Sequence, residues 1–144
     1  MDFLSAMKIS GSALKAERTR INIASMNIAN ANTTRTIEGG PYKAKSVIFK
    51  ATPLPGSFED AFSSVNDKLR QVEVADIVED KAEFKEVYDP SHPDADANGI
   101  VKMPNVNTVE QMVDLMSARR DYEANVAALD SIKAMAIRAL DISK

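Results

Sequence analysis

The feature that most constrains the fold is the helical pattern near the C-terminus. Residues 108–142 carry apolar or long side chains at alternating spacings of three and four, the pattern of a coiled-coil helix. At about 1.5 Å per residue this helix would be roughly 50 Å long, more than a small compact domain requires. Asn107, with Glu110 three residues later, predicts its first turn through a variant of the capping box. The predicted seam consists of Met112, Leu115, Arg119, Tyr122, Val126, Leu129, Lys133, Ala136 and Leu140.

A second set of apolar residues lies beside this seam, and Arg119 and Lys133 interrupt the seam itself. One partner cannot cover both apolar faces, so we expect the helix to contact more than one neighbour. The additional apolar residues are Val109, Met116, Ile132, Met135, Ala139 and Ile142.

The N-terminal segment predicts a second long helix with a narrower apolar stripe. Its large apolar residues recur every seven positions, and small or polar groups such as Ser10, Gly11 and Ala24 stand between them. The end of this helix is rich in asparagine. The stripe consists of Met7, Leu14, Ile21 and Ile28, and the asparagines are Asn22, Asn27, Asn30 and Asn32.

The middle of the chain has strand patterns instead. Val47, Ile48 and Phe49 predict a strand that the following prolines end, segments 72–80 and 84–88 suggest further strands, and "IVKM" predicts a hairpin partner. Residues 56–71 allow either a short helix from Ser57 or a mobile loop. We therefore predict an α+β fold in which two long terminal helices form an antiparallel coiled coil around a small β-rich insert. The predicted divisions are 1–32, 33–106 and 107–144.

Composition argues against catalysis. The 144 residues include no cysteine and one histidine, which excludes disulfides, cysteine zinc sites and thiol nucleophiles. The net charge is −3, and no segment has the basic excess of a nucleic-acid-binding protein. We expect no cofactor, no small-molecule substrate and no nucleic acid. The first residues lack a basic leader and a continuous apolar run, so no cleaved signal peptide is expected.

Local motifs do not change this expectation. "DADANG", Asp94 to Gly99, resembles the opening of an EF-hand loop, but Asn105 stands where the bidentate acid should be. A solvated turn is the preferred interpretation, with His92 as a surface residue of the same turn. Arg119 and Arg120 lie among acids and are expected to form ion pairs. We expect no metal site.

Both ends of the chain resemble one known family. "SGSALKAERTRINIASMNIANANTT", followed by "GGPYKAKSVIF", resembles the N-terminal signature of bacterial flagellar rod and hook proteins. The segment "VYDPSHPDADANGIVKMPNVNTVEQMVDLMSARRDYEANVAALDSIKAM" is similar to the proximal-rod type. The short insert also fits the proximal type better than the hook or distal-rod types. Residues 51–86 contribute little to the resemblance.

This resemblance implies a structural subunit of the flagellar basal body. Such subunits assemble helically, with copies of themselves and other rod proteins, into a rod that crosses the periplasm and transmits motor torque. The resemblance also implies export by the flagellar type III apparatus, without a cleaved signal. A soluble coiled-coil adaptor is the alternative, and it would form a closed small oligomer instead of contacts that propagate. A calcium-binding or hydrolytic module is a further alternative class.

The asparagines can be interpreted in the same terms. Asparagine tolerates the left-handed conformation that ends helices, which accounts for those nearest the helix end. Asn22 and Asn27 lie further back, and we expect them to face other subunits, with simple solvent exposure as the alternative. The expected subunit-interface residues are Met7, Leu14, Ile21, Asn27, Ile28, Asn30, Asn32, Met112, Leu115, Met116, Tyr122, Val126, Leu129, Ile132, Ala136 and Leu140.

Overall fold

Two long helices and two β-hairpins make up the fold. The computed structural model describes residues 3–54 and 69–142. Helix α1 spans Phe3–Ala29 and helix α2 spans Thr108–Ile142. Between them lie the strands β1 (Lys45–Pro53), β2 (Arg70–Glu79), β3 (Lys85–Tyr88) and β4 (Ile100–Met103). The predicted α+β fold, with a β insert between two terminal helices, is therefore confirmed.

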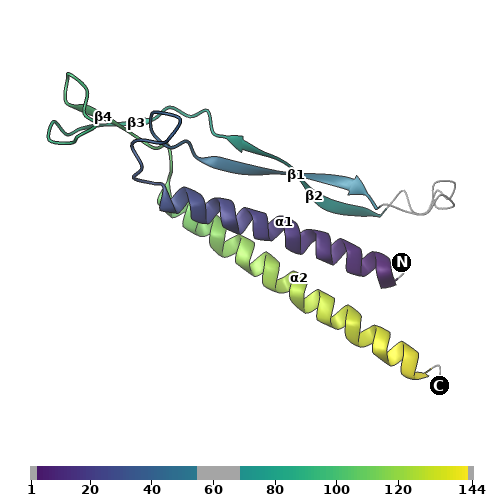
Figure 1. Ribbon diagram of the computed structural model, residues 1–144. Coiled ribbons are helices and arrows are strands. Elements are labelled where there is room, and N and C mark those ends of the chain that lie inside the picture. The colour runs from purple at the N-terminus through teal and green to yellow at the C-terminus, as the bar shows by residue number, and fades with distance from the viewer. Residues whose placement is uncertain (1–2, 55–68, 143–144) are drawn as a thin grey trace.

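Helices α1 and α2 pack against each other in antiparallel directions (Figure 1). Contacts between Asn27 and Gln111 join the end of α1 to the start of α2, and Arg20 contacts Asp114 and Asp121 further along. With 35 residues against 27, α2 is the longer helix, and it continues past the beginning of α1. Helix α2 begins at Thr108, directly after the predicted cap residue. The N–H of Gln111 donates to the carbonyl of Asn107 at 3.0 Å, which is the first bond of the helix.

The long hairpin β1–β2 lies along α1 on a different side from α2, so α1 is the middle layer (Figure 1). Its strands are antiparallel, with Val47 opposite Ile77 and a register shift between Ile48 and Phe49. The backbone N–H of Val72 donates to the hydroxyl of Ser12 at 3.1 Å, which joins β2 to α1. Of the segment with two predicted alternatives, residues 56–68 lie outside the described part of the chain.

The short hairpin β3–β4 projects beyond the helix pair, at the end where α1 stops and α2 starts (Figure 1). Val87 lies opposite Val101 and Tyr88 opposite Ile100, so "IVKM" returns as the predicted hairpin partner. The turn before β4 uses Gly99 at φ +73°, a left-handed conformation that glycine adopts without strain.

The core is small and is made largely of small side chains. Tyr42, Ala44 and Val106 form a buried cluster with Ala31 packed against it, at the junction of the helices and the hairpins. Along the helices the fully covered apolar residues are few and include Ala16, Ile23, Ala24 and Ala118. Neither helix has an apolar stretch that could cross a membrane within the residues that the structure describes.

Candidate assembly surface

Helix α2 faces α1 with a seam whose register differs from the predicted one. Apart from the half-buried Asp114, its buried and half-buried positions alternate by four and three residues, and they include the predicted Leu115, Tyr122, Leu129 and Ala136. Four other predicted seam residues each lie one position after an observed seam residue, so this part of the predicted register is wrong. A shift of one residue turns a side chain about 100° around a helix, so Met112, Arg119, Val126 and Lys133 are exposed. The observed seam is Gln111, Leu115, Ala118, Tyr122, Asn125, Leu129, Ile132 and Ala136.

The corresponding face of α1 carries small and polar side chains. Arg20 and Asn27 contact α2 directly. Residues three, four or seven positions from them share this face, and all are half-buried or buried: Ala13, Glu17 and Ala24. Ser10, three positions before Ala13, is also buried. The predicted apolar stripe lies toward the edge of the helix pair instead, where Met7, Leu14, Ile21 and Ile28 are each half-buried.

Asn27 is a buried centre that joins three parts of the fold. Its side-chain N–H groups donate to the backbone carbonyl of Lys45 and to Oε1 of Gln111, both at 2.8 Å. Its Oδ1 accepts from the hydroxyl of Tyr42 and from the backbone N–H of Lys45, both at 2.9 Å. The side chain is 0 % exposed, so the prediction that Asn27 faces other subunits is wrong. Burial of this amide is tolerated because the N–H groups and the oxygen of the Asn27 side chain are all hydrogen-bonded inside the chain.

The other asparagines have separate roles. Asn30 donates to the carbonyl of Met26 at 2.9 Å and accepts from the hydroxyl of Thr33, so it caps the end of α1 with its side chain. The expected left-handed backbone is wrong, since only glycines have positive φ among the described residues. Asn22 and Asn32 are exposed, and for these two the sequence prediction of a subunit contact stays a prediction.

A second polar group within the helix pair surrounds Arg20. Its guanidinium contacts Asp114 in a short hydrogen bond and lies 3.6 Å from Glu17 and 3.7 Å from Asp121. Burial raises the pKa of the Glu17 carboxyl above its ordinary value, although Arg20 partly offsets the effect. The hydrogen bond to Asp114 raises the pKa of Arg20, so the guanidinium stays charged. Three acids share one cation, and the contact between Arg20 and Asp114 joins α1 to α2.

The first two turns of α2 expose apolar residues on the side away from α1. Val109, Met112, Val113 and Met116, here called the outer stripe, have the i, i+3, i+4, i+7 spacing of one helix face. Their exposed fractions run from 52 to 69 %. Met135, Ile137 and Leu140 are also exposed near the far end of α2. Exposed apolar stripes of this kind mark surfaces that another protein covers.

The acidic turn before β4 holds the chain together instead of forming an open ion site. The hydroxyl of Thr34 donates to Oδ2 of Asp94 at 2.8 Å, and the guanidinium of Arg35 lies 3.9 Å from the same carboxylate. His92 is half-buried, and its Nδ1 accepts from the N–H of Asp94 at 3.1 Å. No group of three or more acidic or histidine side chains that could hold a metal ion occurs in residues 3–54 and 69–142.

Two known families match the chain at its two helical ends. Residues 7–35 match the flagella basal body rod protein family, and residues 97–142 match the family described as flagellar basal body rod FlgEFG protein C-terminal. These ranges contain most of α1, the start of the following loop, β4 and α2. The two long helices and the two family matches together identify the class of protein, which is that of flagellar basal-body rod proteins.

Comparison with full-length relatives identifies the family within this class. The chain is 42 % identical over 144 residues to the flagellar basal-body rod protein FlgC of Escherichia coli O6:H1, with 100 % of both chains covered. It is 41 % identical to the FlgC of Salmonella typhimurium, again with 100 % of both chains covered. Against the FlgC of Bacillus subtilis it is 40 % identical, with 96 % of this chain and 97 % of the relative covered. The chain therefore belongs to the FlgC family of flagellar basal-body rod proteins, a family of structural, non-enzymatic subunits.

Proposed function

We propose that this subunit assembles helically with copies of itself and with other rod proteins, and that the outer stripe of α2 is one of the joining surfaces. The supporting observation is the exposure of Val109, Met112, Val113 and Met116 on the side of α2 that α1 does not cover. Leaving four neighbouring apolar side chains in water is unfavourable, at roughly 25 cal/mol for each Å² of apolar surface, and a neighbouring subunit would remove that cost.

The mechanical role follows from the shape of the molecule. Two helices packed side by side form an elongated body (Figure 1). If each subunit contacts its neighbours through such faces, torque passes through many repeated contacts instead of one. The rod would cross the periplasm, and the subunit would reach it through the flagellar type III export apparatus without loss of an N-terminal peptide. Mass spectrometry of the subunit from isolated basal bodies tests the last point, because a cleaved N-terminus would contradict it.

The outer stripe can be tested without disturbing the fold. Met116→Asp places a charge on a side chain that is 58 % exposed in the single chain. The variant should therefore keep the thermal unfolding of the wild type but fail to enter basal bodies and fail to support swimming. Ser117→Asp is the matched control, because Ser117 is exposed and lies next to Met116 along the chain but points about 100° away.

The same experiment separates the rod subunit from a soluble adaptor. A rod subunit with Met116→Asp disappears from purified basal bodies, whereas an adaptor would be absent from them in the wild type as well. Normal incorporation of the Met116 variant, together with normal swimming, would remove the outer stripe from the assembly surface.

A further inference from the structure

Gly11 lies on the exposed face of α1, where glycine destabilises a helix, and no contact among the described residues explains it. Glycine is the least favourable helix residue after proline. Gly11 lies well inside the helix Phe3–Ala29, and a Cβ built on it would meet no atom within 4 Å. No packing contact within residues 3–54 and 69–142 therefore requires glycine here. A second backbone that approaches this point closely would require it.

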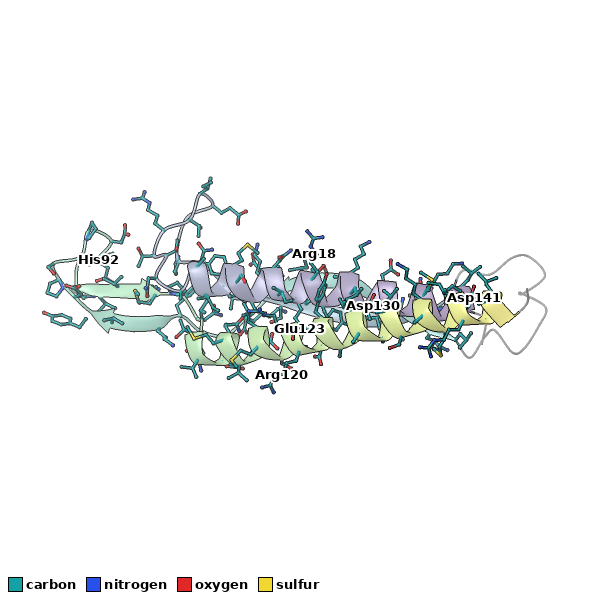
Figure 2. The ribbon with its side chains drawn as sticks, turned by 90° about the horizontal axis from the view of Figure 1, so that it is seen from below. Arg18, His92, Arg120, Glu123, Asp130 and Asp141 are labelled. Carbon is teal, nitrogen blue, oxygen red and sulfur yellow. The ribbon has the colours of Figure 1, made fainter. Side chains whose placement is uncertain are left out.

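The exposed residues around Gly11 make this face of α1 basic. On a helix its neighbours are the residues three and four positions away, which are Lys8 and Lys15 on the exposed side and the half-buried Met7 and Leu14 on the other. Arg18 continues the basic face toward the end of the helix, and Figure 2 shows it pointing away from α2. The only acid of α1, Glu17, lies beside Arg20 in the helix pair.

Helix α2 has an exposed face with acidic side chains around a small residue, which complements the basic face around Gly11. Ala127 is exposed, and its helical neighbours three and four positions away are Glu123, Ala124, Asp130 and Ser131, all exposed. Glu123 and Asp130 follow one another along α2 in Figure 2. The two acids are seven residues apart, as are Lys8 and Lys15, so both pairs span two helical turns, about 10.5 Å.

We propose that the α1 face centred on Gly11 docks on the α2 face centred on Ala127 of a second copy of this chain. The helices approach most closely where glycine meets alanine, and Lys8 and Lys15 form ion pairs with Glu123 and Asp130 on either side of that point. Met7 and Leu14 are covered at the same time. The inference rests on the proposed function, and it assigns the partner surface for one of its contacts.

Two features support this pairing. Where the structure describes the chain, Glu123 has one competing partner, Arg119 at 4.0 Å. Both side chains are 69 % exposed, so that pair is weak. In addition, the two faces lie on different helices of one subunit. A contact between them is heterologous, so it leaves a free face at each end and propagates instead of closing into a dimer.

Engineered cysteines test the contact, because the natural chain has no cysteine. The double variant Gly11→Cys with Ala127→Cys is expressed in cells whose swimming depends on this subunit, and isolated basal bodies are oxidised. Disulfide-linked ladders of the subunit are expected. Gly11→Cys with Ala128→Cys is the control, since Ala128 is exposed and adjacent but points about 100° away, and it should give no ladder.

Charge exchange gives an independent readout if a cysteine at position 11 interferes with assembly. Lys8→Glu with Lys15→Glu should abolish swimming, and adding Glu123→Lys with Asp130→Lys in the same chain should restore it. Where cells with the cysteine pair swim, ladders with the Ala127 pair support the docking. Basal bodies of such cells without a ladder overturn it while leaving the proposed function intact. Where those cells do not swim, the charge exchange decides: restoration supports the docking, and no restoration overturns it. Ladders to another rod protein alone would also overturn it.

Discussion

The side-chain amide of Asn27 donates a hydrogen bond to Oε1 of Gln111 at 2.8 Å, and this bond joins α1 to α2 inside a core with few large apolar residues. The same asparagine also binds Tyr42 and both backbone groups of Lys45, so one residue fixes the helix pair against the start of β1. The antiparallel arrangement therefore depends on a specific polar centre as much as on burial of apolar surface.

Asn27→Ala should strongly destabilise the isolated subunit. The substitution leaves the N–H of Lys45, the hydroxyl of Tyr42 and Oε1 of Gln111 without their partner, at a cost of about 2–4 kcal/mol. Urea unfolding followed by circular dichroism measures the loss. Asn22→Ala is the matched control on the same helix, and because Asn22 is exposed its effect should stay within about 0.5 kcal/mol. Equal effects of the two substitutions would contradict the role given to Asn27.

Glu17 should make stability depend on pH in a particular direction. Its folded pKa lies above the ordinary value of 4.5 because burial disfavours the carboxylate. The folded protein therefore binds this proton more tightly than the unfolded chain. The contribution of Glu17 to the free energy of unfolding should increase as pH falls through the folded pKa, and the gain is complete below the unfolded value.

The variant Glu17→Gln isolates this contribution. Glutamine resembles the protonated acid, so the variant should be more stable than the wild type at neutral pH, and the difference should shrink as pH falls toward 4.5. Parallel urea titrations of both proteins across this pH range provide the measurement. A difference that does not change with pH would show that the carboxylate is not penalised in the folded state.

Two glycines should respond to alanine in opposite ways. Gly11→Ala should stabilise the isolated subunit by about 1 kcal/mol, because the site is open and helical. Gly99→Ala should destabilise it by about 1 kcal/mol or more, because φ is +73° there. The added Cβ would also lie 3.1 Å from side-chain atoms of Pro90 and Tyr88. Thermal unfolding of the two variants distinguishes these outcomes, and a loss of stability in Gly11→Ala would show that the glycine serves the single chain.

The sequence predicted the elements of the fold better than the faces of the helices. Helix α2 was predicted from its length and its cap, and the hairpin β3–β4 from a dense turn followed by "IVKM". The register of the α2 seam was half wrong because the prediction favoured large residues such as Met112 and Val126. The observed seam uses Gln111 and Asn125 instead, since the opposing face of α1 is itself small and polar. A pattern of apolar residues cannot reveal a polar seam.

The burial of Asn27 contradicts the sequence prediction for a related reason. A helix cap does not explain an asparagine as far inside α1 as Asn27, which favours a subunit contact. Its partners inside the chain, Lys45 and Gln111, are 18 and 84 residues away in the sequence. Contacts at that separation leave no local signal. By contrast, the exposure of Met116 could be expected from the sequence, because α1 alone could not cover both this residue and the predicted seam. The structure places Met116 in the outer stripe.

The central claim is that the outer stripe of α2 is exposed in the single subunit and covered in the rod. Met116→Cys introduces the only thiol of the chain on this stripe, and its rate of maleimide labelling can be compared between the purified subunit and intact basal bodies. The urea-unfolded subunit supplies the rate of a fully accessible thiol. Fast labelling of the purified subunit and strong protection in the basal body are the predicted result, whereas equally fast labelling in both would contradict the account.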